Sequence, residues 1–259
     1  RDCLLSRGLG DVYKRQDIDG LEAGTNHGRA ADKYVYSASV VNQWLEKPST
    51  QPKNKKIVFV TFDDGPTTKF TGEQLDNLEK AGARATFFMI PPQMRDVGKN
   101  MLSRSLKMGN ALAIHSYSHD YKYLYHGSAA NKAKHISCDW DWAMAQSRAI
   151  LGSNYFSSAF RYPGGHMSWT NLSQADATLA KRGVGWIDWN AMSGDADAQR
   201  PTTVPGYLQM VKKSIKESNN PNVVVILNHD TYGKQMTAKA MPSILAWLKS
   251  QGYEFGVIA

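Results

Sequence analysis

The stretch IVFVTFDDGP, residues 57–66, joins an apolar run to two acids and a Gly-Pro pair. The run has the length and composition of a β-strand, and the Gly-Pro pair predicts a turn directly after it. A second run, VVVIL at 223–227, is continuously apolar. Such runs are typical of strands covered on both faces, as in a parallel sheet.

Strand-like runs alternate with segments of helical period from residue 57 to the end of the chain. The expected strands are Ile57–Phe62, Ala85–Ile90, Ala111–His115, Ser158–Arg161, Val184–Trp189, Val223–Asn228 and Tyr253–Ile258. The expected helices are Gly72–Ala81, Lys99–Met108, Ala129–Leu151, Leu172–Arg182, Pro205–Ser218 and Ala238–Ser250. The alternation predicts an α/β fold with a parallel sheet, either open and doubly wound or curled into a closed or distorted barrel. No GxGxxG follows the first strand, which disfavours dinucleotide binding.

The N-terminal part of the chain has a different composition. Residues 1–16, RDCLLSRGLGDVYKRQ, resemble a translated sequencing adapter and are set aside as an artefact. Residues 17–54 are rich in Gly, Ser, Thr, Asn and charge, so we expect a tail or linker with one short helix near Val40–Glu46. The main folded domain is therefore expected over 55–259.

The net charge limits the kinds of molecule that the protein is expected to bind. Residues 1–16 contain four Lys or Arg and two Asp, so the formal charge falls from +8 to +6 without them. That excess is compatible with simple solubility or with attraction to an anionic surface such as a cell wall. No basic run is interleaved with aromatics, so nucleic acid is not an expected partner. No apolar run approaches the ~20 residues of a transmembrane helix.

Polar residues follow the ends of the predicted strands. They are Asp63, Asp64, His115, Arg161, Asp195 and His229. In a parallel α/β barrel these strand ends lie on one face, where such folds place their sites.

The sequences DD at 63–64 and HSYSH at 115–119 suggest a metal site. Adjacent carboxylates repel unless a cation compensates one of them, although two solvated acids in a turn are the simpler alternative. Two His four residues apart can face one side of a helical turn and bind a metal together. With Asp64 as third ligand, this set suits Zn²⁺ and its neighbours and leaves a position for water.

Two further residues fit acid–base chemistry. Arg161 near Asp63 would hold that carboxylate ionised. His229 ends an apolar strand, where a structural histidine is the common alternative, but a nearby Asp would make it a plausible general acid.

Taken in order, TFDDGP, HSYSH, RYPGG, SGDA and LNH resemble the five motifs of the polysaccharide deacetylase family (carbohydrate esterase family four, with a NodB-homology domain) over about 55–259. The resemblance implies a distorted (β/α) barrel of about seven parallel strands with helices outside. It also implies metal-dependent hydrolysis of N-acetyl groups on amino-sugar polysaccharides, a reaction at a carbon–nitrogen bond other than a peptide bond.

The resemblance assigns roles residue by residue. The implied catalytic residues are Asp63 (base), His229 (acid), Arg161 and Asp195; the metal ligands are Asp64, His115 and His119; the substrate-binding residues are Leu227, Gly164, Tyr162 and Trp189. The implied cofactor is one divalent ion, with Zn as the expected metal and Co, Ni or Mn as alternatives. A monomeric enzyme acting on peptidoglycan or a chitin-like glycan, outside a bacterial cell or at its wall, is expected.

The third and fourth motifs depart from the family pattern. Gly164 stands where the family has an aromatic residue, and Met192 and Ala196 replace the first Asp and the Trp of the fourth motif. Trp186 or Trp189 could take the place of the missing Trp in the pocket. Two other functions stay open: an inactive relative that only binds glycans, and a hydrolase of a small non-sugar amide.

Overall fold

A computed structural model of the protein describes residues 16–219 and 221–259. Its strands are β1 (Val35–Tyr36), β2 (Lys56–Gly65), β3 (Ala85–Met89), β4 (Ala111–Ile114), β5 (Ala159–Phe160), β6 (Gly185–Trp186), β7 (Ala191–Met192), β8 (Val223–His229), β9 (Tyr253–Phe255) and β10 (Val257–Ile258). Its α-helices are α1 (Ala38–Glu46), α2 (Thr68–Ala81), α3 (Met94–Lys107), α4 (Tyr121–Tyr125), α5 (Ala129–Leu151), α6 (Ser173–Ala180), α7 (Val204–Glu217) and α8 (Gln235–Ser250).

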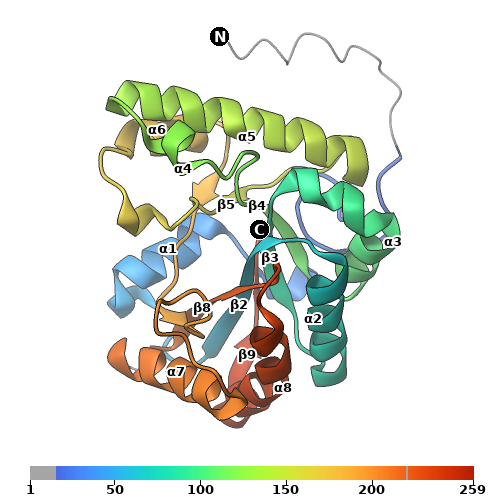
Figure 1. Cartoon of the computed structure of the whole chain (residues 1–259), viewed down its shortest axis with the longest axis vertical. Coiled ribbons are helices and arrows are strands. Elements are labelled where there is room, and N and C mark those ends of the chain that lie inside the picture. Colours follow the sequence, from blue (N-terminus) through green and yellow to red (C-terminus); the bar gives the residue numbers. More distant parts are fainter. Residues whose placement is uncertain (1–15, 220) are drawn as a thin grey trace.

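The main sheet is parallel and runs in the order β6-β5-β4-β3-β2-β8-β7, with β9 paired to β2. Helices surround the curled sheet (Figure 1), and the predicted distorted (β/α) barrel is confirmed. The strands β6 and β7 stand at the two ends of this order, so the barrel is open between them.

Strand β2 shows why the sheet is covered on both faces. Its residues from Ile57 to Asp63 are buried. Because side chains alternate along a strand, Val58 and Val60 pack into the outer core beneath the helices, whereas Phe59 packs inside the barrel with residues such as Val225. A continuous apolar run therefore supplies two hydrophobic layers.

The expected helices are present, but α2, α3 and α8 begin three to five residues earlier than predicted. Helix α5 has the predicted bounds, and Ser128 caps it by accepting the N–H of Asn131. Helix α3 begins earlier than predicted, with a non-helical residue at Gly98. The predicted last strand is two strands, β9 and β10, separated at Gly256, where a Cβ would meet the Phe59 ring at 2.6 Å.

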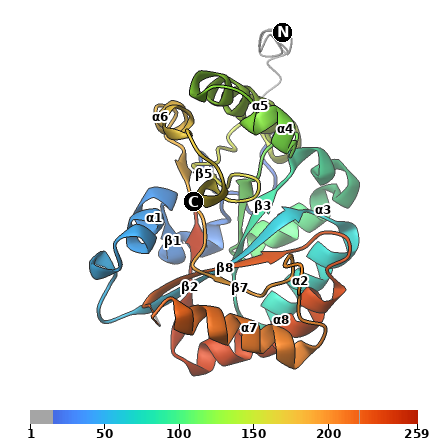
Figure 2. The same cartoon turned by 60° about the vertical axis from the view of Figure 1, so that its left-hand side comes forward.

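The N-terminal segment differs from the predicted tail or linker because it is folded onto the barrel. Strand β1 pairs with β10, and Leu21 is buried. Helix α1 covers the predicted short helix and packs Ala38, Val41 and Trp44 against the barrel interior. Figure 2 shows α1 at the side of the sheet between α6 and α7. A few apolar residues at helical spacing thus fill the opening that the sheet leaves.

The adapter-like stretch 1–16 lies outside the described residues, apart from Gln16. Within the described ranges, none of the helices combines the length and the apolar character that crossing a membrane requires.

Candidate active site

The six polar residues predicted at strand ends come together at the carboxyl edge of the sheet. Asp63 and Asp64 lie near the end of β2, His115 follows β4, Arg161 follows β5, Asp195 follows β7, and His229 ends β8. The parallel order of the strands brings these ends to one edge.

An irregular strand end separates the two adjacent acids. The pairing of β2 with β3 shifts between Asp63 and Gly65, and Asp64 has a φ of 68°. A non-glycine residue in that conformation is strained and persists where the surroundings hold it. A Cβ on Gly65 would collide with the carboxylate of Asp230, so this approach requires glycine. The irregular strand end lets the carboxylates of Asp63 and Asp64 contact different partners.

Asp64, His115 and His119 form a compact group of metal-type ligand atoms, which lie within 4.8 Å of one another. Asp64 Oδ1 is 3.3 Å from His115 Nε2 and 3.1 Å from His119 Nε2. Burial acts to raise the pKa of Asp64, but the two imidazoles outweigh it and hold the pKa well below its usual value. Burial acts to lower the pKa of His119, and the Asp64 carboxylate outweighs it and raises the pKa.

The histidine pair lies in a loop, and the predicted helical turn is wrong. Ser116 and His119 have φ values of 79° and 48°. The buried Asp139 of α5 accepts the N–H groups of Tyr117 at 2.7 Å and Ser118 at 2.9 Å. A carboxylate outside the motif therefore holds the loop in the shape that turns both imidazoles toward Asp64.

The donor set fits a divalent cation. His115 Nδ1 is 2.9 Å from the carbonyl oxygen of Arg161, which favours the tautomer with its proton on Nδ1 and leaves a lone pair on Nε2. Asp64 Oδ1 is buried yet accepts no hydrogen bond from the described residues. Two imidazole nitrogens and one carboxylate oxygen converging in this way are ligands of the kind that Zn²⁺ takes.

Asp63 is held by Arg161 on the inner side of the ligand group. Arg161 Nη1 donates to Asp63 Oδ1 at 2.9 Å and to Thr61 Oγ1 at 2.6 Å. The guanidinium is fully buried, and its other donors reach the carbonyls of Ile187 and Asp188. Asp63 Oδ2 is 3.8 Å from His115 Nε2, so one oxygen is anchored and the other faces the ligand group.

His229 also lies near the ligand group, with Nε2 4.0 Å from Asp64 Oδ2. Its Nδ1 is 2.8 Å from Asp195 Oδ1, and its backbone N–H donates to Asp195 Oδ2. Thr237 also donates to that carboxylate. Burial acts to lower the pKa of His229, but Asp195 outweighs it and raises the pKa above its ordinary value.

The four predicted substrate-binding residues differ in their surroundings. Leu227 is nearly buried but belongs to none of the hydrophobic clusters of the described residues. Gly164 has a φ of 78° and lies beside Tyr121. The ring of Trp189 lies 5.6 Å from Arg161 Cζ. Tyr162 is fully buried, and its predicted contact with substrate stays a prediction.

Sequence reasoning missed three buried acids near the site. Besides Asp139, these are Asp188 and Asp230. Asp188 accepts the backbone N–H groups of His166 and Met167 and so fixes the loop after RYPGG. Burial raises the pKa of Asp230 to about 7, and the charges of Asp64 and Asp63 add to the rise. Asp188 in IDWN and Asp230 in ILNHD both lie within two residues of a strand end, a signal that could have identified them.

Fold and site together define a hydrolase-type centre on a parallel barrel: three residues of metal-ligand type, a carboxylate held by arginine and an imidazole held by a carboxylate. The polysaccharide deacetylase family model matches residues 50–181, and the chain belongs to this family of deacetylase enzymes.

Similar proteins agree with this assignment. A solved CE4 esterase from Streptococcus mutans is 39% identical, with a TM-score of 0.84, over 94% of this chain and 100% of that one. A bifunctional xylanase/deacetylase from Pseudobutyrivibrio xylanivorans is 30% identical over 97% of this chain but only 38% of its own length. A peptidoglycan-N-acetylglucosamine deacetylase from Bacillus cereus is 28% identical over 78% of this chain and 69% of its own length.

Proposed function

We propose that this protein removes N-acetyl groups from an amino-sugar polysaccharide by metal-assisted hydrolysis. The observation that carries the proposal is the placement of Asp63 and His229, each with its own partner, around the Asp64–His115–His119 group. A base and an acid that both lie near a group of metal-type ligands are what metal-assisted hydrolysis of an amide requires.

Asp64, His115 and His119 would hold the metal. Zn²⁺ is the proposed ion, and it would supply the Lewis acidity that activates a water and polarises the acetyl carbonyl. Asp63 accepts the proton of the attacking water, because Arg161 anchors its Oδ1 and leaves Oδ2 directed at the ligand group.

His229 completes the reaction by donating a proton to the sugar nitrogen as the carbon–nitrogen bond breaks. Water thus adds its oxygen to the acetyl carbon, and the products are acetate and the free amine. The Asp195 carboxylate stabilises the protonated imidazole, which is the form that can donate.

The proposed substrate is peptidoglycan or a chitin-like glycan, and the proposed location is outside a bacterial cell or at its wall. The Bacillus cereus relative is named for deacetylation of peptidoglycan N-acetylglucosamine. The net charge, +8 for the full sequence and +6 without residues 1–16, is compatible with attraction to an anionic wall polymer.

The test is acetate release from peptidoglycan and from N-acetylglucosamine oligomers, with metal content measured on the same samples. Removal of metal by a chelator is expected to abolish release, and added Zn²⁺ is expected to restore it. Asp64→Ala and His119→Ala should lose bound metal and activity together. Full metal occupancy in both variants would exclude this ligand set.

A further inference from the structure

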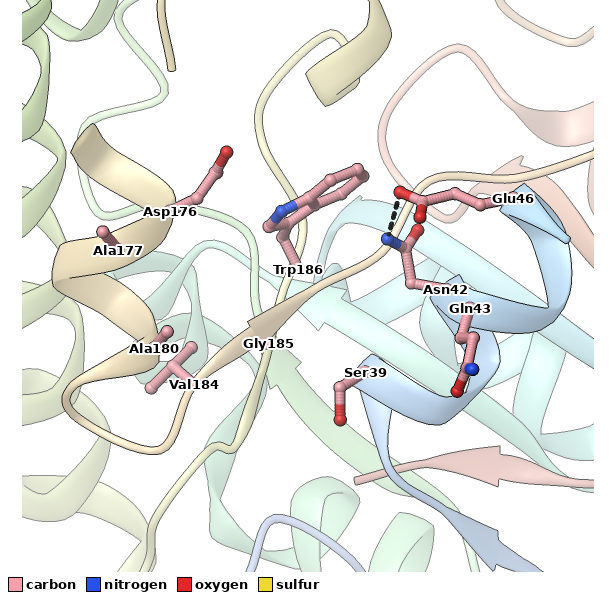
Figure 3. A pocket seen from close by; sticks show the side chains of 10 residues that line it. All are labelled: Ser39, Asn42, Gln43, Glu46, Asp176, Ala177, Ala180, Val184, Gly185 and Trp186. Carbon is pink, nitrogen blue, oxygen red and sulfur yellow. Dashed lines mark hydrogen bonds between the residues drawn. The ribbon is translucent and has the colours of Figure 1, made fainter. Parts of the chain in front are cut away.

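A groove lies between α1 and α6. It has a volume of about 350 Å³, within the range of about 300–1,000 Å³ usual for small-ligand sites. Figure 3 shows the ten residues that line it: Ser39, Asn42, Gln43, Glu46, Asp176, Ala177, Ala180, Val184, Gly185 and Trp186. None of them is assigned a role in the proposed reaction.

Helix α1 contributes a polar stripe to this groove. Ser39, Asn42, Gln43 and Glu46 follow the spacing i, i+3, i+4 and i+7, which places them on one face of the helix. The opposite face carries Val41 into the barrel interior. One helix thus closes the barrel with its apolar side and presents amides, a hydroxyl and a carboxylate to the groove.

The indole of Trp186 is a fixed aromatic surface within the groove. His166 stacks on it with ring centroids 3.8 Å apart and an interplanar angle of 2°. Asp176 holds His166 through Nε2 at 2.9 Å and accepts the hydroxyl of Tyr162 at 2.8 Å. Figure 3 shows the indole between Asp176 and the pair formed by Asn42 and Glu46. A ring held in place in advance binds a ligand with little loss of side-chain entropy.

The charge of the groove contrasts with that of the chain. The protein has a formal charge of +8, yet the ten described residues that line the groove include two carboxylates and neither Lys nor Arg. Both oxygens of Asp176 are engaged by Tyr162 and His166. At Glu46, Oε1 accepts the Asn42 amide at 3.0 Å, whereas Oε2 has no partner among the described residues. The groove therefore offers one oriented anion beside one aromatic face.

We infer that this groove binds a sugar unit bearing a free amine, with the pyranose ring against Trp186 and the ammonium group at Glu46. This inference rests on the proposed function, because a free amino sugar is the product of the deacetylation. The electron-rich face of an indole attracts the positively polarised C–H bonds of a pyranose ring, and a carboxylate attracts the ammonium.

The position of the groove supports a segment of the same glycan as its occupant. His166, which stacks on Trp186, donates its backbone N–H to Asp188, and the carbonyl oxygen of Asp188 accepts a hydrogen bond from Arg161 of the candidate site. A polymer that presents one acetyl group to the metal ligands must extend beyond them. A groove that retains deacetylated units would favour reaction next to sugars that have already reacted.

The test measures binding of a glucosamine pentamer and of cellopentaose to the full chain, at mildly acidic pH where the amines are protonated. Neither probe carries an acetyl group, so binding is independent of turnover. Wild type should bind the glucosamine pentamer more tightly. Glu46→Gln should weaken that binding about three- to fivefold, as for an exposed ion pair, and leave cellopentaose unchanged. Glu217→Gln, an exposed carboxylate on α7, is the matched control.

Variants of Trp186 test the aromatic surface. Trp186→Ala should weaken both probes about tenfold, and Trp186→Phe, which keeps a ring on His166, should weaken them less. Unchanged affinity of Glu46→Gln for the glucosamine pentamer would overturn the inference. Acetate release from N-acetylated oligomers is scored separately. If the wild type releases acetate but binds the two oligosaccharides equally, only the inference about the groove is contradicted. If it binds the glucosamine pentamer more tightly but releases no acetate, only the proposed function is contradicted.

Discussion

The carboxyl edge of the sheet and the side closed by α1 are built in opposite ways. At the edge, charged side chains such as Asp63, Arg161 and Asp195 are buried and each is held by a specific partner, as Arg161 holds Asp63. At the α1 side, apolar residues such as Val41 fill the barrel and the polar residues remain exposed. Substitutions at the edge should therefore affect chemistry more than folding, and substitutions under α1 should affect folding more than chemistry.

The largest effect is expected for the acid and base at the edge. Asp63→Asn and His229→Ala should each lower kcat/KM by at least about 100-fold, the loss typical of a removed acid or base. Neither residue belongs to the metal-ligand group, so bound metal should be retained. Metal analysis and acetate release on the same preparations check both statements. Loss of metal in either variant would show that metal binding and acid–base catalysis at the edge depend on the same residues.

On the α1 side, Val41→Asp should destabilise the fold by about 3 kcal/mol or more, because it buries an unpaired charge. The neighbouring Val40 is 39% exposed, so Val40→Asp should change stability by less than about 0.5 kcal/mol. Denaturant unfolding of both variants measures the difference. If residues 17–54 were a linker, the two substitutions would have the same small effect.

Many of the site residues at the carboxyl edge could be predicted from sequence, because they directly follow strands that are long enough to show a recognisable apolar pattern. The runs leading to Asp63 and His229 are continuously apolar. The two-residue strands β5, β6 and β7 have too little sequence for any period, so their bounds were wrong or they were missed. Helix α1 lies in a stretch of polar composition, which concealed its apolar face.

Contacts across the fold could not be predicted. Asp139 lies 20 residues beyond His119 in the sequence, in the middle of a long helix, and only the packing of α5 brings its carboxylate to the histidine loop. Tyr162 was expected at the substrate because of its place in RYPGG, and the structure buries its side chain in the core. Motifs identify residues that do chemistry more readily than those that position them.

The next prediction concerns the carboxyl edge and the support that Asp139 gives to the histidine loop there. Asp139→Asn keeps the size of the side chain but removes one acceptor oxygen and the charge. Metal affinity should fall about tenfold, as for other groups that orient metal ligands from outside the ligand set. Asp141→Asn, on the same helix, removes only a contact with Arg182 at 3.1 Å and should leave metal affinity unchanged. Equal affinities in the two variants would show that the loop holds its shape without Asp139.

The smallest expected effect is a shift in pH dependence caused by Asp195→Asn. His229 must be protonated to donate, so activity is lost as the pH rises through its pKa, and the alkaline limb of kcat/KM reports that value. Asp195 raises this pKa against the lowering effect of burial. Removing the carboxylate charge should therefore move the alkaline limb to lower pH while bound metal is retained. Asp197→Asn, two residues further along and without a hydrogen bond to His229 among the described residues, should leave the limb in place. The measurement is kcat/KM against pH on a soluble acetylated oligosaccharide. An unmoved limb in Asp195→Asn would mean that the alkaline limb reports another group and that His229 is not the acid.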